Sequence, residues 1–358
     1  QTQAALHRHK PPHNPHPIRP THPQKTTMAH IYIYSPSGAV RDTASFKRAI
    51  TRLQKLGHQV EIDPDALTTH QRFAGDDATR IAAITRAAAS GADAALITRG
   101  GYGLSRILPA LPYKKIAKAI ERGTRFVGLS DFTALQTALL AQAGKNTTTW
   151  AGNLLIDDWG QSAGTDEITQ ACFSEMLDGS SEGTGWQLGK KDLPDPSRPL
   201  LPHAVENATL WGGNLCVLTS LLSTPYFPKI KKGVLFLEDI AEHPYRIERM
   251  LTQLLHAGVI DKQKAVLLGQ FTDYKTTPHD KGFNLQTVVQ WLRSQTKTPI
   301  ITGLPHGHTA TKVLLPVGAR IDLVEQDRNL LLLWGHLPTA SQHAAHPTCT
   351  LPECTCEH

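Results

Sequence analysis

A serine that could act as a nucleophile stands where an apolar strand gives way to a helix. Ser130 follows the expected strand Arg125–Leu129 and precedes the expected helix Phe132–Ala143. A serine on such a turn exposes its hydroxyl, and the helix amides behind it can stabilise an oxyanion. The full nucleophile-elbow pattern has a glycine two residues after the serine, where this chain has Phe132. Taken alone, the local pattern therefore favours an N-cap for the helix over a nucleophile.

The acid and the base of such a site stand in the second half of the chain. Glu238 and Asp239 end the apolar run 234–237, where an acidic pair is costly to bury without a partner such as a protonatable histidine. His306 and His308 lie at the end of a later strand. A histidine held by a carboxylate can accept the proton of a serine and return it to a leaving amine. Chemistry alone leaves both histidines eligible, but the pattern indicates a Ser–His–Glu hydrolase.

A glycine-rich loop, Arg99–Gly103, follows another expected strand and brings backbone amides close to the edge of the sheet. It lacks the Lys-Ser or Lys-Thr pair of a phosphate-binding loop and the spacing of a dinucleotide fingerprint. The other interpretations are a tight turn and an oxyanion donor that faces Ser130, one strand further along. The absence of the phosphate motifs favours the oxyanion donor.

Strand-like and helix-like periodicities alternate along the first half of the chain. The expected strands are His30–Tyr34, His58–Ile62, Ala94–Thr98 and Arg125–Leu129, and the expected helices are Asp42–Lys55, Asp76–Ser90, Tyr113–Arg122 and Phe132–Ala143. This alternation predicts a parallel sheet with helices on both faces. Ligands of such sheets collect at the carboxyl ends of the strands, where the glycine-rich loop and Ser130 both lie.

The second half predicts a β-rich α/β unit, reached through a linker. Residues 178–202 are rich in Gly, Ser, Pro and Asp and show little periodicity, which is typical of a linker. The strands expected beyond it are Gly233–Leu237, Ala265–Gly269, Pro299–Thr302, Val313–Val317 and Leu330–Trp334, with helices at Tyr245–Ala257 and Leu285–Ser294. The last two strands are expected to close the second domain.

These patterns predict an α/β protein of two domains, with the active site at their interface. The predicted division is a disordered extension at 1–28, a nucleophile domain at 29–177, a linker at 178–207, a domain that carries the acid and the base at 208–338, and a cysteine-containing tail at 339–358.

Composition limits the class of protein further. The formal net charge is +6, but the basic residues are dispersed, so nucleic acid is not expected as the main partner. No window approaches the roughly 18 uncharged apolar residues of a membrane span. The first 27 residues contain no apolar segment of a secretory signal, so they are expected to be disordered and the protein to be cytoplasmic.

Five cysteines form no convincing disulfide framework in a chain of this length. Cys172 and Cys216 stand singly among apolar residues and are expected to be small buried hydrophobes. Cys349, Cys354 and Cys356 lie near histidines in the tail and could bind zinc. Because no second ligand pair with zinc-site spacing follows them, a disordered tail without a metal site is the favoured interpretation.

Several short segments together resemble the muramoyltetrapeptide LD-carboxypeptidases, a serine peptidase family that also contains the microcin C immunity peptidases. The matching segments occur in family order between about residues 29 and 338. They are Arg72–Gly75, Arg99–Gly103, Gly128–Thr133, Leu210–Leu215, Leu235–Ile240, His243–Arg246, Gly303–His308 and Leu315–Gly318.

The resemblance implies a role for each of several residues. It implies Ser130 as nucleophile, Glu238 as the acid that orients the histidine, and His308 as general base, in preference to His306. It places oxyanion donors at the backbone of Gly101 and Asp131. Asn214 is expected to line the substrate cleft. The free carboxylate of the substrate needs a cationic or amide-rich pocket, for which Arg99, Gly100 and Arg246 are the candidates.

The resemblance also implies a reaction. Such an enzyme hydrolyses the bond between the L-centre of diaminopimelate and the terminal D-alanine of a murein tetrapeptide, free or sugar-linked, through an acyl-enzyme. It needs no metal or organic cofactor, and the family makes a homodimer an expectation. Two alternatives stay open at this stage. One is an immunity-type peptidase acting on an acylated peptide-nucleotide, and the other is a non-enzymatic module that binds a small ligand.

Overall fold

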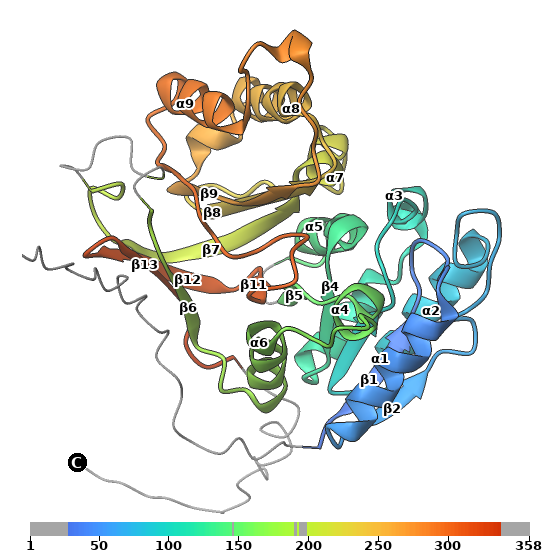
Figure 1. Ribbon diagram of the computed structural model, residues 1–358. Helices are drawn as coiled ribbons and strands as arrows, with labels where there is room; N and C mark the ends of the chain where they lie inside the picture. The colour runs from blue at the N-terminus through green and yellow to red at the C-terminus, as the bar shows by residue number, and fades with distance from the viewer. Residues whose placement is uncertain (1–27, 145–146, 190–191, 193–198, 338–358) are drawn as a thin grey trace, which may run out of the picture.

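The computed structural model describes residues 28–144, 147–189, 192 and 199–337 (Figure 1). Within these residues the chain forms two sheets, each packed against helices. The strands are β1 (His30–Tyr34), β2 (Gln59–Ile62), β3 (Ala94–Ile97), β4 (Arg125–Gly128), β5 (Thr149–Ala151), β6 (Gly183–Gln187), β7 (Val205–Asn214), β8 (Val234–Ile240), β9 (Ala265–Thr272), β10 (Ile300–Ile301), β11 (Leu315–Val317), β12 (Arg320–Gln326) and β13 (Asn329–Leu333).

The α-helices of the described residues alternate with these strands. They are α1 (Thr43–Lys55), α2 (Asp77–Ala89), α3 (Leu104–Ile107), α4 (Tyr113–Glu121), α5 (Thr133–Gln142), α6 (Glu167–Asp178), α7 (Leu215–Ser220), α8 (Pro244–His256) and α9 (Leu285–Gln295). Short helical turns are η1 (Leu108–Ala110), η2 (Ser130–Phe132), η3 (Leu155–Trp159), η5 (Ile260–Lys262) and η6 (Pro278–Asp280).

The first sheet has the strand order β11-β5-β4-β3-β1-β2. Strands β1 to β5 are parallel to one another, and β3 and β4 are buried along their whole length. Burial on both faces is what their continuous apolar runs predict. The predicted parallel sheet is therefore confirmed, and it gathers the loops after β3 and β4 at one edge.

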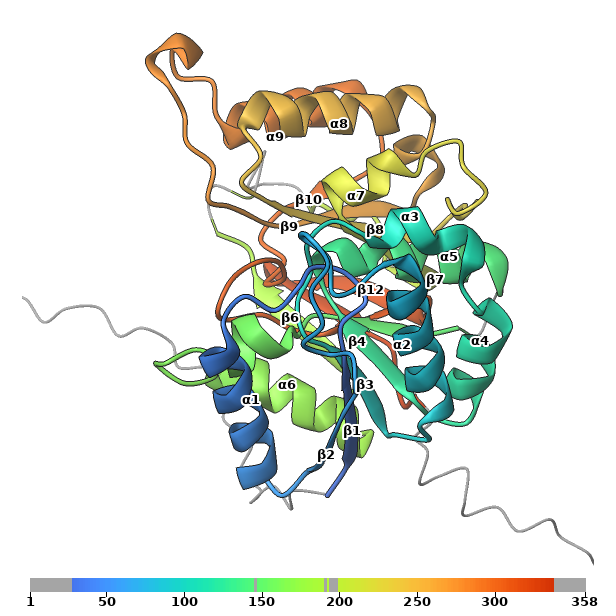
Figure 2. The ribbon, with the colours of Figure 1, turned by 90° about the vertical axis from the view of Figure 1, so that its right-hand side faces the viewer.

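The second sheet has the order β10-β9-β8-β7-β12-β13-β6. Strands β7 to β10 are parallel, whereas β12, β13 and β6 run antiparallel to their neighbours. Figure 2 shows α8 and α9 side by side over one face of this sheet. In Figure 1 this unit lies above the first sheet, which is at the lower right with α1 and α2.

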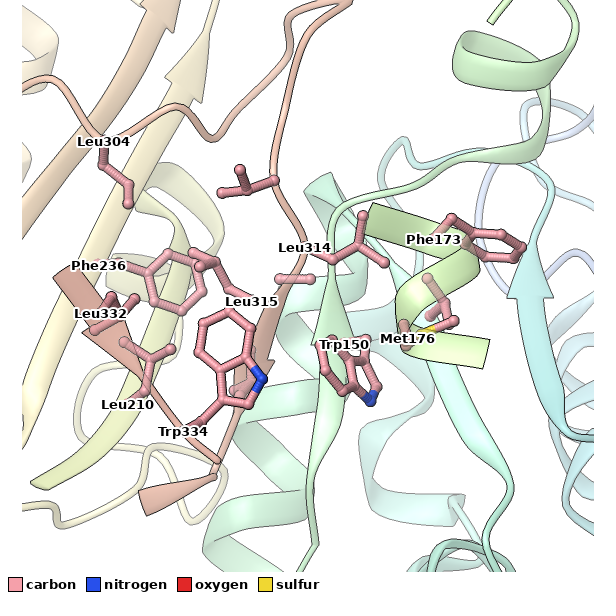
Figure 3. Close-up of a cluster of buried hydrophobic side chains, with 14 of the residues drawn as sticks. Trp150, Phe173, Met176, Leu210, Phe236, Leu304, Leu314, Leu315, Leu332 and Trp334 are labelled. Carbon is pink, nitrogen blue, oxygen red and sulfur yellow. The ribbon is translucent and has the colours of Figure 1, made fainter. Parts of the chain in front are cut away.

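Side chains from both units form one continuous apolar core (Figure 3). Trp150 of β5 is 3% exposed, and its ring meets that of Trp334 edge to face at 6.2 Å between centroids. Phe236 of β8 and Leu314, which precedes β11, belong to the same cluster. Since apolar burial is the main favourable term in folding, the two sheets stabilise each other and are not independently folded domains.

Two expectations about the chain path are wrong. Residues 178–202 are not a structureless linker, because they contain β6, which pairs with β13 along five residues. β6 is an edge strand with three exposed or half-exposed residues before Trp186, so it lacks the apolar pattern of an inner strand. The segment 313–317 does not close the second unit, because β11 pairs antiparallel with β5 of the first sheet.

The shared core makes a prediction about stability. Trp150→Ala should lower the free energy of unfolding by about 3–5 kcal/mol, because the cavity would lie between the two sheets and neither could fill it without moving. Chemical denaturation followed by circular dichroism measures this. Leu67→Ala is the control, since Leu67 is 47% exposed and its loss should cost about 0.5 kcal/mol. Equal effects of the two substitutions would contradict a shared core.

Candidate active site

Ser130 lies directly after β4, where the chain turns into η2 and α5. Its φ is +66°, a left-handed conformation that costs a non-glycine residue about 1–3 kcal/mol unless the surroundings hold it. The amides of Phe132 and Thr133 close the turns of η2, which leaves the amide of Asp131 at the start of the helical segment. A strained serine with an amide beside it is the arrangement of a nucleophile elbow, and Ser130 makes no N-cap hydrogen bond.

The glycine-rich loop packs against this serine. A Cβ atom added to Gly100 would lie 2.6 Å from the Cβ of Ser130 and 2.7 Å from its Oγ. Gly101 has a φ of +102°, and the carbonyl of Gly100 accepts a hydrogen bond of 3.3 Å from the amide of Gly38. The loop thus lies on Ser130, as the oxyanion interpretation requires, and it is more than a tight turn.

The side chain of Asp131 fixes the loops around Ser130. Its Oδ2 accepts hydrogen bonds from the hydroxyl of Ser37 (2.8 Å) and from the amide of Leu104 (2.9 Å). Burial raises the pKa of Asp131 to about 6. The carboxyl therefore ties the loops after β1 and β3 to the nucleophile turn, while its backbone amide is the group expected to face an oxyanion. Ser37 was not singled out from the sequence, because nothing local marks it.

Glu238 and His308 form a close pair of a buried carboxyl and a partly buried imidazole. Glu238 is fully buried near the end of β8, and its Oε2 lies 2.7 Å from Nδ1 of His308. Burial lowers the pKa of His308, but the hydrogen bond and the negative charge of Glu238 outweigh burial and raise it above its ordinary value. The carboxylate engages Nδ1, so the other ring nitrogen, Nε2, is left for a substrate or a nucleophile.

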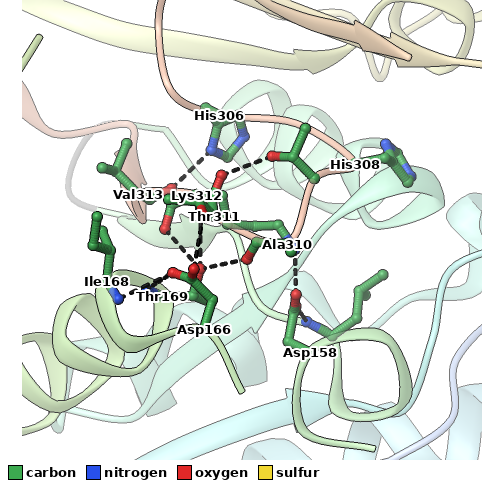
Figure 4. A network of polar contacts seen from close by, with 12 residues as sticks. Asp158, Asp166, Ile168, Thr169, His306, His308, Ala310, Thr311, Lys312 and Val313 are labelled. Atoms are coloured by element: carbon green, nitrogen blue, oxygen red, sulfur yellow. Dashed lines mark hydrogen bonds and ion pairs between the residues drawn. The ribbon is translucent and has the colours of Figure 1, made fainter. Parts of the chain in front are cut away.

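His306 is held in a different way. It is fully buried, its Nδ1 lies 2.9 Å from the carbonyl of Val313, and its ring packs edge to face on Phe236. Burial lowers the pKa of His306 to about 4. Figure 4 shows the two imidazoles pointing to different sides of the loop. The geometry favours His308 as the base and gives His306 a structural position.

Strand β7 of the second sheet contacts the turn that follows Ser130. A Cβ atom on Gly213 would lie 2.4 Å from the hydroxyl of Thr133, and that hydroxyl accepts a 2.9 Å hydrogen bond from the amide of Asn214. Asn214 stands opposite Glu238 in the register of β7 and β8. The two sheets are therefore joined next to Ser130 by hydrogen bonds that run from Thr133 through Asn214 to Glu238.

Asn214 was expected to line the substrate cleft, but its side chain forms hydrogen bonds with other residues of the protein. Its Nδ2 donates to Glu238 (3.2 Å) and to Asp239 (2.9 Å), and its Oδ1 accepts from the amide of Val217. Only 3% of the residue is exposed. The structure therefore gives Asn214 the task of orienting Glu238. Asp239, whose pKa is raised to about 6 by burial and by the charge of Glu238, is the second carboxyl in this network.

The two arginines proposed for the substrate carboxylate differ. Arg99 is half-buried at the start of the glycine-rich loop, where its Nη1 donates to the carbonyl of Ala39 at 3.3 Å. Burial and the neighbouring Arg41 lower its pKa, which indicates a local excess of positive charge. Arg246 is largely exposed and is paired with Glu242. Of these two arginines, Arg99 is the one that belongs to the loop packed against Ser130.

Other predicted features lie away from this site or outside the described residues. Cys172 and Cys216 are free and pack against the apolar core, where they are partly buried rather than buried as expected. The cysteines of the tail lie outside the described residues. In the described part of the chain, no His, Cys, Asp or Glu side chains form a metal-binding group of three or more. No described helix has the length and the apolarity to cross a bilayer.

The fold defines an α/β hydrolytic enzyme in which the turn of Ser130 and the pair of Glu238 and His308 come from different sheets. Comparison with known families agrees. Residues 31–150 match the model of the LD-carboxypeptidase N-terminal domain, and residues 207–323 match that of the LD-carboxypeptidase C-terminal domain. The chain belongs to the LD-carboxypeptidase family, and the predicted resemblance is confirmed.

Individual relatives cover most of the chain. A crystal structure of muramoyltetrapeptide carboxypeptidase from Oxalobacter formigenes is 38% identical, with a TM-score of 0.76 over 87% of this chain and 100% of that one. A Bacillus subtilis protein named "Probable murein peptide carboxypeptidase" is 29% identical over 78% of this chain and 84% of its own. The microcin C7 self-immunity protein MccF of Escherichia coli is 26% identical over 68% of this chain and 74% of its own.

The contact between Gly100 and Ser130 can be tested by adding one methyl group. Gly100→Ala should reduce peptidase kcat/KM by about a hundredfold or more, because the new Cβ must displace the nucleophile. Gly91→Ala is the control. Its new Cβ would meet nothing within 4 Å, so activity should be kept. Its φ of +68° strains an alanine, so the free energy of unfolding should fall. Equal activity of the two variants would show that the loop does not constrain Ser130.

The pair of Glu238 and His308 predicts a pH effect. Glu238→Gln removes the charge that raises the pKa of His308, while burial still lowers it. The acid limb of kcat/KM against pH should therefore move to lower pH, and kcat should fall by about a thousandfold.

Glu61→Gln is the matched control for this pH profile. It breaks a similar pair, in which Oε2 of Glu61 lies 2.8 Å from Nε2 of His30, at an exposed place in the first sheet. Glu61→Gln should leave the acid limb of kcat/KM at the same pH as in the wild type. An acid limb that stays fixed in Glu238→Gln would mean that His308 is not the titrating base.

Proposed function

We propose that this chain is a serine LD-carboxypeptidase that removes the terminal D-alanine from murein tetrapeptides, using Ser130, Glu238 and His308. The observation that carries the proposal is the 2.7 Å contact between Glu238 and His308, set beside a serine held at a φ of +66°. Relatives named as muramoyltetrapeptide and murein peptide carboxypeptidases support this choice of substrate.

The proposed chemistry begins with attack by Ser130. Its Oγ adds to the carbonyl carbon between the L-centre of diaminopimelate and D-alanine, while Nε2 of His308 takes the proton. The amides of Gly101 and Asp131 stabilise the oxyanion. His308 then protonates the leaving amine, D-alanine departs, and an ester to Ser130 remains. Water, deprotonated by His308, cleaves that ester and releases the tripeptide.

Glu238 keeps the base in one orientation throughout this cycle. Its contact with Nδ1 stabilises the imidazolium that forms when the serine gives up its proton. Within the described residues, no hydrogen bond joins the hydroxyl of Ser130 to the imidazole of His308. Catalytic hydrogen bonds are often long in free enzymes and shorten when substrate binds.

Recognition of the terminal carboxylate is assigned to Arg99 together with the amide of Gly100. A guanidinium in a half-buried place binds a carboxylate more strongly than one in open water. Arg246 keeps a lesser part in this proposal, because it is exposed and paired with Glu242. The proposed setting is peptidoglycan recycling in the cytoplasm, a compartment that suits the free thiols of Cys172 and Cys216.

The similarity to MccF makes an acylated peptide-nucleotide the second substrate to test. Trp159 and Trp186 are the tryptophans before and within segment 178–202 that an aromatic nucleotide-binding loop could use, and they are 0% and 8% exposed. The indole of Trp186 donates to the carbonyl of Thr302. Both are packing residues, so neither favours that substrate over the murein peptide.

The decisive assay is release of D-alanine from a diaminopimelate tetrapeptide. Wild-type protein should release it, and Ser130→Ala should lose about 10³-fold or more of kcat while its melting temperature does not fall. Mass spectrometry identifies the tripeptide product. A folded wild-type protein that releases no D-alanine, but cleaves the acylated peptide-nucleotide in the same assay, would transfer the assignment to the immunity-type activity.

A further inference from the structure

A buried ion pair lies on the loop that carries His308. Lys312 and Asp158 are joined by a salt bridge, and their side chains are only 3% and 2% exposed. Asp158 belongs to the short helical turn η3 after β5 of the first sheet, whereas Lys312 follows His308 on the chain that returns from the second sheet. The pair therefore connects the part of the molecule that carries the nucleophile with the loop that carries the proposed base.

Several hydrogen bonds fasten the same stretch of chain (Figure 4). The hydroxyl of Thr169 accepts from the amide of Lys312 at 2.9 Å and donates to the carbonyl of Ala310 at 2.8 Å. The hydroxyl of Thr311 donates to Asp166 at 2.7 Å. All these partners stand at or near the start of α6, so three consecutive residues of the loop, 310–312, are bound to the first unit.

The other side of the loop is bound to the second unit. The amide of Val313 donates to the carbonyl of Pro305 at 2.8 Å and closes the loop at its base. The hydroxyl of Thr272, at the end of β9, donates to the carbonyl of His308 at 3.3 Å. His308 thus sits between anchors from both sheets, and its distance from Ser130 depends on both.

We propose that the Lys312–Asp158 ion pair is a positioning device for His308, which locks the loop of the base onto the unit that carries the nucleophile. The inference rests on the proposed function of His308. A buried ion pair is a weak source of stability, because desolvation of both charges offsets their attraction. Its value here is geometric, since a displacement of about 1 Å in a catalytic group can cost about a hundredfold in rate.

The ammonium of Lys312 also acts on the base through its charge. Besides burial, three charged groups act on His308: Glu238 and Asp239 from β8, and Lys312 from its own loop. Burial and the charge of Lys312 lower the pKa of His308, against the raising effect of Glu238 and Asp239. Lys312 therefore opposes the carboxylates and keeps more of the imidazole in the neutral form that can accept a proton.

The test replaces the pair by neutral groups of similar shape, Asp158→Asn with Lys312→Met, so that no unpaired charge is buried. The melting temperature should change little, kcat for D-alanine release should fall about tenfold or more with little change in KM, and the acid limb of the pH profile should move to higher pH. NMR titration of the His308 ring, assigned with His308→Gln, should show the same rise in its pKa without any substrate.

The matched control is an ion pair of the first unit, Asp63 and Arg86, in which the Asp63 side chain is fully buried and the Arg86 side chain is 36% exposed. Asp63→Asn with Arg86→Met should affect stability and leave kcat, KM and the titration of His308 unchanged. A folded Asp158→Asn/Lys312→Met protein with wild-type kcat and an unmoved His308 titration would overturn the proposal. Because the titration needs no substrate, this result is distinct from a failure of the carboxypeptidase assignment.

If the Asp158→Asn/Lys312→Met protein does not fold, Thr169→Val tests the same proposal. It removes the hydroxyl that binds residues 310 and 312 and alters no charge. It should lower kcat with KM and the pH profile unchanged, because only the position of the loop is affected. Wild-type kcat in this variant would contradict the positioning role.

Discussion

The structure depends on the contact between the end of β7 and the start of α5. Gly213 has no side chain, which lets the backbone of the second sheet approach Thr133, and the amide of Asn214 binds the hydroxyl of Thr133 at 2.9 Å. Through Asn214 and its neighbour Glu238 this contact reaches His308. A larger residue at 213 would separate the turn of Ser130 from the pair of Glu238 and His308, since the two lie on different sheets.

The apolar core supplies the rigidity that this contact needs. Trp150, Trp334 and Phe236 belong to one cluster that spans both sheets, and β11 returns from the second unit to pair with β5 of the first. A hinge between two domains would let the catalytic groups drift, whereas a close-packed interior has few alternative arrangements. The chain thus crosses between the units more than once, and each crossing limits their relative motion.

The polar residues around the site divide into reacting groups and groups that hold them. Asp131 binds the loops after β1 and β3 through its carboxyl, Asn214 orients Glu238, and Lys312 with Asp158 holds the loop of His308. Each of these side chains is almost fully buried. Buried polar groups are costly unless they are paired, so each network fixes a single geometry.

The sequence by itself determined the parallel sheet, the strand that precedes Ser130 and the apolar strand that leads to Glu238, because apolar runs and turn residues are local signals. It also carried the family resemblance. Local chemistry could not choose between His306 and His308. It also could not reveal β6, the pairing of β11 with β5, the hydrogen bond from Asn214 to Glu238, or the ion pair of Lys312 with Asp158. Those features depend on contacts between residues far apart in the chain. Only the tertiary structure decides which side chain meets a carboxylate and which is buried.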